Sequence, residues 1–244
     1  MEPQRAGVVA AAAVAVLLWL VKDALRADAF AAQPRVVILM FSTPNILEYA
    51  KYSARVNAAY ARRHGYDFRH VVGPSPHPTP AWYKVRLLRE ALDTHDVAFF
   101  IDSDAVFNRM HESLDGFLAH DADLMGCTDS PNGPYHINCG TLLARSTPWA
   151  KGFLDAWWGL RDEPKYNKWA FEQQALHDLI DADAHGCQAH AKVKVFPVDA
   201  FNSNISDLLG HANGARQAFV MHFMSTGADV RKRELKAVCA REKV

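Results

Sequence analysis

The sequence has no surplus of either charge, because Lys plus Arg and Asp plus Glu each number 27 and the formal net charge is zero. A nucleic-acid partner normally requires a basic surplus against the phosphate backbone, so we expect none here. The sequence also lacks internal repeats, and its N-terminal Ala/Val run is the only low-complexity segment. Evidence for function must therefore come from local motifs.

Cysteine is sparse and is not spaced for metal binding. The four cysteines are Cys127, Cys139, Cys187 and Cys239. They show no C-x-x-C spacing, which argues against a zinc or iron–sulfur site. Two interpretations remain open for them. Either they form one or two disulfides in an oxidising compartment, where four cysteines allow three full pairings, or they are small buried side chains.

The N-terminus contains an uncharged apolar run from Ala6 to Val21. A membrane-spanning helix needs roughly 17–25 such residues, and this run is at the short end of that range. We expect a tail over 1–5, a transmembrane signal-anchor over 6–22, a short stem over 23–34 and a globular domain over 35–244. A cleaved signal peptide is the main alternative, and a buried helix is the third.

The anchor and the signal peptide both direct the domain to the secretory lumen. For the anchor we expect a single-pass type II protein of the Golgi or endoplasmic reticulum membrane. The sequon Asn204–Ser206 is compatible with that route. The charges that flank the apolar run are weak evidence for orientation.

Hydrophobic patterns along the domain alternate between strand and helix. Strands are expected over 35–41, 66–72 and 97–101, and helices over 46–64, ending at the cap Gly65, and 82–92. Later strands are expected over 123–127, 137–144, 193–198 and 219–223, and later helices over 148–160 and 171–180. This order indicates βαβ units, so we expect an α/β fold with a mixed, mostly parallel central sheet flanked by helices.

The expected strand 97–101 ends directly in Asp102-Ser103-Asp104. Carboxylates two residues apart on an extended chain project to the same side. Hard divalent cations prefer carboxylate and phosphate oxygens, and ligands of open parallel sheets bind beyond the carboxyl ends of the strands. D-x-D alone is a common triplet, and two solvated aspartates in a turn are the simple alternative. Its place at the end of a buried strand favours a Mg²⁺ or Mn²⁺ site for a nucleotide diphosphate.

Several further motifs stand in a fixed order around this triplet. They are Trp82–Arg89, Phe99–Phe107, Ile137–Arg145, Glu172–Leu176, Phe201–Ser203 and His222-Phe223. In this order they resemble glycosyltransferase family 34, which contains galactosyl-, mannosyl- and xylosyltransferases. The resemblance runs from about Val36 to Phe223.

The resemblance implies a retaining, Mn²⁺-dependent transferase with the GT-A-type nucleotide-sugar-binding fold, acting from a UDP- or GDP-sugar on a glycan acceptor. In it Asp102, Asp104 and His222 hold Mn²⁺, with Mg²⁺ as the alternative. The donor-binding residues it implies are Ser42, Thr43, Lys84, Ser103, Asn138 and Gly140, together with the two aspartates. Glu172 and Gln173 face the anomeric carbon as the catalytic residues. Without the resemblance, His222 is more simply a buried core histidine and Glu172 or Lys84 a solvated helix residue.

Two other functions stay open at this point. A catalytically inactive homologue would keep the fold as a scaffold, and an inverting transferase would need a general base for the acceptor. A nucleotidyltransferase would want an early Gly-rich phosphate loop, which the sequence does not have. The retaining route is either a double displacement through a carboxylate or a same-face reaction, and we expect the second.

The sequence departs from the family pattern after Phe223. A Gly-Cys segment often follows there, whereas this chain has Met224–Gly227. The basic contact to the diphosphate then falls to Arg231, Lys232 or Lys236, and the sequence does not choose among them. The donor sugar, the acceptor and the oligomeric state are not predicted.

Overall fold

A computed structural model describes residues 33–128, 137–183, 189–205 and 218–244. The chain separates into two units, Met1–Pro34 and Arg35–Val244. The expected anchor over 6–22, most of the expected stem, Cys187 and Ser206 lie outside the described residues. Within the described ranges, no helix is long and apolar enough to cross a membrane.

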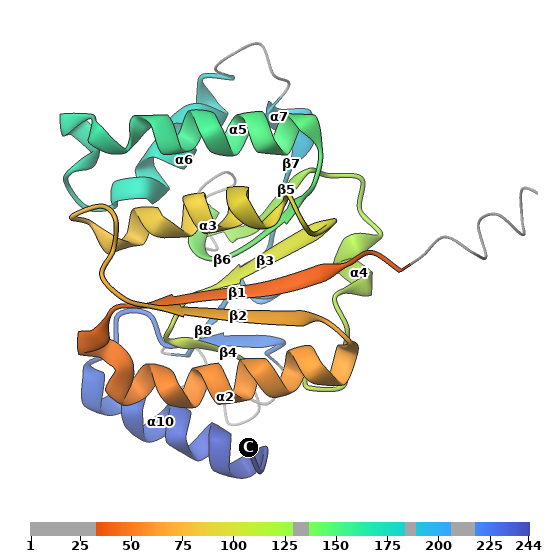
Figure 1. Cartoon of the computed structure of the whole chain (residues 1–244), viewed down its shortest axis with the longest axis vertical. Coiled ribbons are helices and arrows are strands. Elements are labelled where there is room, and N and C mark those ends of the chain that lie inside the picture. The colour runs from red at the N-terminus through yellow and green to blue at the C-terminus, as the bar shows by residue number, and fades with distance from the viewer. Residues whose placement is uncertain (1–32, 129–136, 184–188, 206–217) are drawn as a thin grey trace, which may run out of the picture. The chain divides into compact units, whose positions relative to one another are not determined.

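The unit Arg35–Val244 is built on a six-stranded sheet in the order β2-β1-β3-β6-β5-β7 (Figure 1). The strands are β1 (Val36–Ser42), β2 (Asp67–Val72), β3 (Val97–Ile101), β5 (Leu124–Thr128), β6 (Ile137–Arg145) and β7 (Val193–Phe196). Pairs β1–β2, β1–β3 and β5–β7 are parallel, and β6 is antiparallel to both its neighbours. This confirms the expected mixed, mostly parallel sheet.

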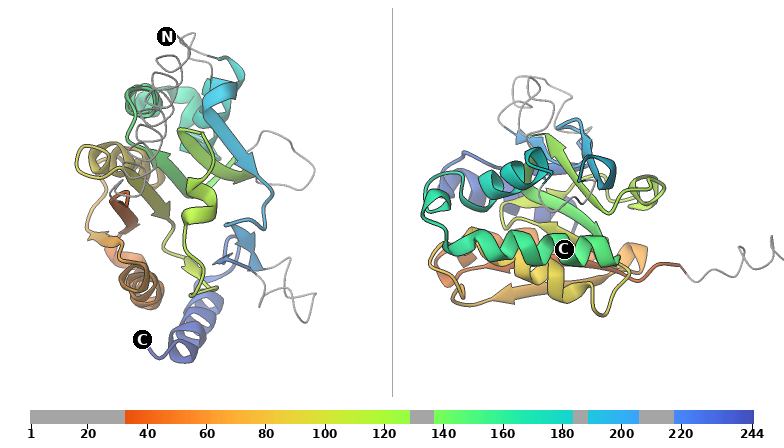
Figure 2. Two further views of the ribbon diagram at one scale, coloured as in Figure 1. Left: turned by 90° about the vertical axis from the view of Figure 1, so that its right-hand side faces the viewer. Right: turned by 90° about the horizontal axis from the view of Figure 1, so that it is seen from above.

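Helices cover both faces of the sheet (Figures 1 and 2). On one side lies α2 (Leu47–His64), with α10 (Ala228–Arg241) packed along it; on the other lie α3 (Tyr83–Ala91), α5 (Pro148–Gly159) and α6 (Phe171–Asp181). Short helices are η1 (Pro44–Ile46), η2 (Pro80–Trp82), α4 (Asp115–Leu118), η3 (Leu160–Asp162), η4 (Pro164–Tyr166) and α7 (Ala189–Lys192). As expected, α2 ends at Gly65, whose φ of 71° is the left-handed cap conformation.

Two apolar clusters hold these layers together. Alternate residues of the central strands point to opposite faces, so that Ile38 and Phe99 pack against α2 while Leu39 and Phe100 pack against α3 and α5. Every residue of β1 and β3 is buried. Burial on both faces is the physical reason that these strands are continuous apolar runs rather than alternating ones.

A second, three-stranded sheet in the order β4-β9-β8 lies beyond the end of β3. Its strands are β4 (Ala105–Phe107), β8 (Ser203–Asn204) and β9 (Val220–His222). The sequence analysis predicted β9 but neither β4, β8 nor α10. The two missed strands have three and two residues, too few for an alternation of polar and apolar side chains to show.

Candidate active site

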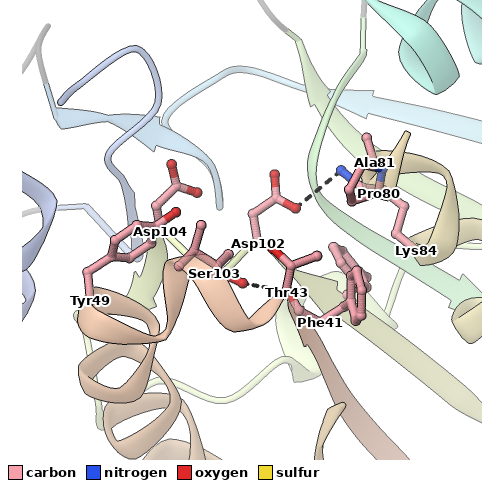
Figure 3. A pocket seen from close by; sticks show the side chains of 11 residues that line it. Phe41, Thr43, Tyr49, Pro80, Ala81, Lys84, Asp102, Ser103 and Asp104 are labelled. Atoms are coloured by element: carbon pink, nitrogen blue, oxygen red, sulfur yellow. Dashed lines mark hydrogen bonds and ion pairs between the residues drawn. The ribbon is translucent and has the colours of Figure 1, made fainter. Parts of the chain in front are cut away.

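Asp102, Ser103 and Asp104 join the end of β3 to the start of β4. The two aspartate carboxylates point to the same side of the chain, as the spacing predicted (Figure 3). Their side chains are 30% and 13% exposed, so both are reachable from solvent yet largely enclosed. The backbone N–H of Asp102 donates to the Gly140 carbonyl at 2.8 Å, which ties the triplet to β6.

Ser103 is held in place by a chain of hydrogen bonds that runs from His70 through Ser42 to the Phe41 carbonyl. Its hydroxyl donates to the Phe41 carbonyl at 2.5 Å, so it accepts from the Ser42 hydroxyl 2.8 Å away. Ser42 has then used its proton and accepts in turn from His70 Nε2 at 2.8 Å. Ser42 is completely buried, so its hydroxyl acts on the site through Ser103, whereas Thr43 lines the neighbouring pocket.

His222 reaches the triplet through the small sheet. β9 pairs antiparallel with β4 so that His222 lies opposite Ala105, next to the aspartates. Its Nε2 lies 3.3 Å from Asp104 Oδ1 and 3.9 Å from Asp102 Oδ2. One ligand atom from each of the three residues lies within 4.8 Å of the other two. The three metal ligands expected from the sequence are therefore brought together.

The hydrogen-bond partners of His222 determine which tautomer the neutral ring adopts. Asn138 Oδ1 accepts from the Gly140 backbone N–H at 2.9 Å, so it also accepts from Asn202 Nδ2 at 2.9 Å. Asn202 then presents its oxygen to His222 Nδ1, again at 2.9 Å. In the neutral ring the proton thus sits on Nδ1, and the lone pair of Nε2 faces the two carboxylates.

This donor set fits a divalent cation such as Mn²⁺. Two carboxylates and an imidazole nitrogen are ligands that Mn²⁺ accepts. A ligating histidine usually donates its other ring N–H to an oxygen that fixes the ring, as Asn202 does here. When bound, the cation would neutralise charge on a substrate's diphosphate.

Lys84 lies at the centre of a buried ionic cluster. Its Nζ is 3.2 Å from Asp102 Oδ1 and 3.1 Å from Glu172 Oε1, and it donates to the Cys139 carbonyl at 2.9 Å. Burial alone would lower the pKa of Lys84, but the two carboxylates raise it above its usual value. Lys84 is therefore a cation that links the aspartate triplet to α6.

The three acids respond differently to burial. Burial raises the pKa of Asp102, and the nearby Lys84 and His222 offset this only in part. Burial also raises the pKa of Glu172 against the opposing effect of Lys84. For Asp104, His222 and Arg231 outweigh burial and hold the pKa at about 2. Asp104 is the acid of this site that stays ionised most readily.

Gln173 and the start of β6 complete the far side of the site. Gln173 Oε1 accepts from the Cys139 backbone N–H at 3.0 Å, next to Asn138 and Gly140. Because β6 runs antiparallel to β3, its N-terminal residues lie beside the carboxyl end of β3. All the catalytic and donor-binding residues expected from the sequence thus lie in one region, where Glu172 and Gln173 are joined to the aspartates through Lys84 and β6.

A pocket of about 150 Å³ opens beside the aspartates (Figure 3). Its lining is apolar on one side and polar on the other. The lining residues are Phe41, Thr43, Ile46, Tyr49, Pro80, Ala81, Lys84, Phe100, Asp102, Ser103 and Asp104.

Arg231 on α10 contacts two of the residues that line this pocket, Asp104 and Tyr49. Its guanidinium lies 2.9 Å from Asp104 Oδ2 and over the ring of Tyr49. Lys232 instead pairs with Glu48 on the surface, and Lys236 is exposed. Of the three candidates left open by the sequence, Arg231 alone contacts the aspartate triplet among the described residues.

The sequence reasoning missed roles for Asn202 and Tyr49, and it named Arg231 only as one of three basic candidates. Asn202 stood in a recognised motif, but nothing in the sequence tied its amide to His222. Tyr49 reads as an ordinary apolar position of a helix. The described cysteines Cys127, Cys139 and Cys239 are buried, which favours the small-hydrophobe interpretation for these three.

Comparisons with known proteins agree with this geometry. Residues 32–127 match the sequence model of the galactosyl transferase GMA12/MNN10 family. That segment contains Lys84 and the aspartate triplet but ends before Asn138, Gln173 and His222, whose place in the site rests on the structure. No curated protein matches the chain.

Solved glycosyltransferases share the fold. One involved in glycosylation of the major capsid of PBCV-1 superposes with a TM-score of 0.70 at 18% identity, covering 84% of this chain and 100% of that one. The galactosyltransferase LgtC, bound to donor and acceptor sugar analogues, superposes with a TM-score of 0.54 at 14% identity. The match covers 84% of this chain and 95% of LgtC. The glycosyltransferase GlyE of Streptococcus pneumoniae TIGR4 superposes with a TM-score of 0.55 at 13% identity. The match covers 86% of this chain and 63% of GlyE. Residues 32–127 are thus similar to the galactosyl transferase GMA12/MNN10 family, and the fold is that of the GT-A glycosyltransferases.

Proposed function

We propose that this chain transfers a hexosyl or pentosyl unit, namely galactose, mannose or xylose, from a nucleotide diphosphate sugar to a glycan acceptor with retention of α configuration. The reaction depends on Mn²⁺, or alternatively Mg²⁺, bound by Asp102, Asp104 and His222. The observation that carries the proposal is the convergence of these three side chains from β3 and β9, with their donor atoms within 4.8 Å, beside a pocket.

The pocket suits a nucleotide diphosphate donor. Its apolar side, formed by residues such as Phe41, Ile46 and Tyr49, can receive a nucleoside. The diphosphate then lies toward the aspartates, where the cation and Arg231 offset its charge. The sugar extends toward Asn138, Gly140 and Gln173. Arg231 supplies the basic contact that the departure after Phe223 left unassigned.

Glu172 is poorly placed to act as a nucleophile. Its carboxylate is 5% exposed and is held by Lys84 at 3.1 Å. A same-face reaction needs no protein nucleophile: the bond from C1 to the departing phosphate breaks, the acceptor oxygen bonds to C1 on the same face, and the phosphate takes the acceptor proton. Glu172 and Gln173 then stabilise positive charge on the sugar ring. LgtC, which shares the fold, has been solved with an active-site glutamine changed to glutamate.

The test is to offer the full chain a panel of UDP- and GDP-sugars with Mn²⁺ and to follow hydrolysis and transfer. We expect one donor to be consumed, activity to vanish with a chelator and return with Mn²⁺, and NMR of the product to show an α linkage. A β linkage would favour the inverting alternative. If donor binds but is not consumed, the chain is the inactive scaffold homologue. Absence of metal-dependent donor binding, unchanged by Asp104→Ala, would overturn the proposal.

We further propose that the N-terminal apolar run anchors the protein in a Golgi or endoplasmic reticulum membrane as a type II protein. The support is the uncharged stretch from Ala6 to Val21 and the sequon at Asn204. Enzymatic removal of an N-glycan from the protein made in eukaryotic cells tests the lumenal location, since a cytosolic domain carries none.

A further inference from the structure

Trp169 is 90% exposed, whereas the other described tryptophans are buried or half-buried. An indole is usually well buried because its large apolar surface is costly to hydrate. Among the described residues, its one ring contact is a T-shaped one with Phe171, at 6.0 Å between centroids. The faces of the indole are therefore open to a ligand.

The turn that carries Trp169 is fixed on both sides. Phe171 N–H donates to the Lys168 carbonyl at 2.8 Å, and Gln173 N–H donates to the Ala170 carbonyl at 3.0 Å. Phe171 has a φ of 51°, a left-handed conformation that is rare for a non-glycine residue and occurs where surrounding contacts enforce it. The exposed indole thus stands on an ordered turn.

This turn leads directly into the catalytic end of α6. Trp169 precedes Glu172 by three residues, and three residues span at most about 10–11 Å between Cα atoms. Upstream, buried Tyr166 packs edge-on against Trp82, the neighbour of the pocket residue Ala81. Figure 1 shows the segment between α5 and α6 at the same end of the sheet as the first turn of α2.

We infer that Trp169 is the platform on which a sugar ring of the acceptor stacks. A pyranose presents apolar C–H groups on one face, which pack on an aromatic face, while its hydroxyls stay hydrated. The nucleoside side of the pocket is lined from η1, α2 and η2, so a ring on Trp169 lies outside the donor subsite. Assigning the ring to the acceptor rests on the proposed function; the sugar site itself does not.

The experiment separates these two statements. Saturation-transfer NMR is recorded for the full chain with methyl α- and β-glycosides of galactose, glucose, mannose and xylose. Wild type should transfer saturation to the C–H protons of at least one glycoside. Trp169→Ala should weaken that binding about tenfold, the loss of one aromatic stacking contact, while Trp169→Phe retains most of it. Trp158→Ala, which removes a half-buried indole from α5, should leave glycoside binding unchanged.

Donor hydrolysis to water is followed in parallel. Trp169→Ala should leave its rate and the donor KM within about twofold, since the platform does not touch the donor. Glycoside binding that fails in wild type, survives in Trp169→Ala, or falls equally in Trp158→Ala overturns the inference even if the enzyme hydrolyses donor. Trp169-dependent binding without any donor turnover instead overturns the proposed transfer and leaves the sugar site in place.

Discussion

Gly140 and His222 face each other so closely that a Cβ on Gly140 would lie 2.2 Å from His222 Cε1 and 2.9 Å from Asn138 Oδ1. No Cβ tolerates such a contact, so either β6 or the imidazole must move when the glycine is replaced. Both neighbours belong to the hydrogen-bonded chain that orients the metal-facing nitrogen. The absence of a side chain at this position is thus part of the proposed metal site.

Gly140→Ala should therefore reduce transferase activity by at least about tenfold, because misplacement of catalytic groups by a fraction of an ångström is costly. Mn²⁺ affinity, read by electron paramagnetic resonance, should fall with it. Gly152→Ala is the matched control: its Cβ would meet nothing within 4 Å in α5, and it should stabilise the fold by about 0.5–1 kcal/mol. Equal activity in the two variants would contradict the role given to Gly140.

Asn202→Ala should weaken Mn²⁺ binding about 10–100-fold, the usual effect of removing the partner that orients a ligating histidine. The variant leaves Asp102, Asp104 and His222 in the chain, so the effect isolates ring orientation. Titration with Mn²⁺ at fixed pH measures it. Unchanged affinity would mean that the His222 ring keeps its orientation without Asn202, or does not bind the metal.

Lys84→Met should lower the free energy of unfolding by about 3–5 kcal/mol, because it leaves the buried Glu172 and the partly exposed Asp102 without the cation that they share. Combining it with Glu172→Gln removes one of these charges and should restore part of the loss. Urea denaturation without metal gives both values. A double variant that is as unstable as the sum of its single changes would show that the Lys84–Glu172 pair is not coupled.

Local sequence patterns predicted the aspartate triplet, whereas His222 could be named only through the family resemblance, and the reason is physical. Asp102 and Asp104 follow a strand whose apolar run is visible locally, and the end of a parallel strand is where ligands bind. His222 lies opposite Ala105 through a strand pairing that spans over a hundred residues, and no local pattern encodes it. The resemblance supplied His222; the structure supplied its partner Asn202.

The position of Arg231 in the site could not be predicted from local sequence either. Helix α10 buries only Leu235, Val238 and Cys239, so its apolar positions are too few to give a clear amphipathic pattern. The fold places it along α2, which brings Arg231 to Asp104 and Tyr49. The sequence could name three basic candidates, but packing of α10 on α2 selects one.

Stability should depend on pH through Asp104 in a defined window. Its folded pKa of about 2 lies below the unfolded value of about 3.9, so its ionised form stabilises the fold. That contribution is present above about pH 4 and is lost as pH falls toward 2. The difference in unfolding free energy between wild type and Asp104→Asn, measured without metal, should shrink across this range. A difference that stays constant with pH would show that the carboxylate is not selectively stabilised.

Arg231→Met should raise the donor KM about tenfold, because the guanidinium is the basic group that contacts Asp104 and the proposed donor brings a diphosphate to that position. Arg231→Lys should recover part of the loss, since it keeps the charge but not the planar fork. Lys232→Met is the control, as Lys232 pairs with Glu48 on the surface and such pairs contribute little. Steady-state kinetics with Mn²⁺ saturating separates donor binding from metal binding. If Lys232→Met raised KM as much as Arg231→Met, the effect would be one of general surface charge, and Arg231 would have no specific contact with the donor.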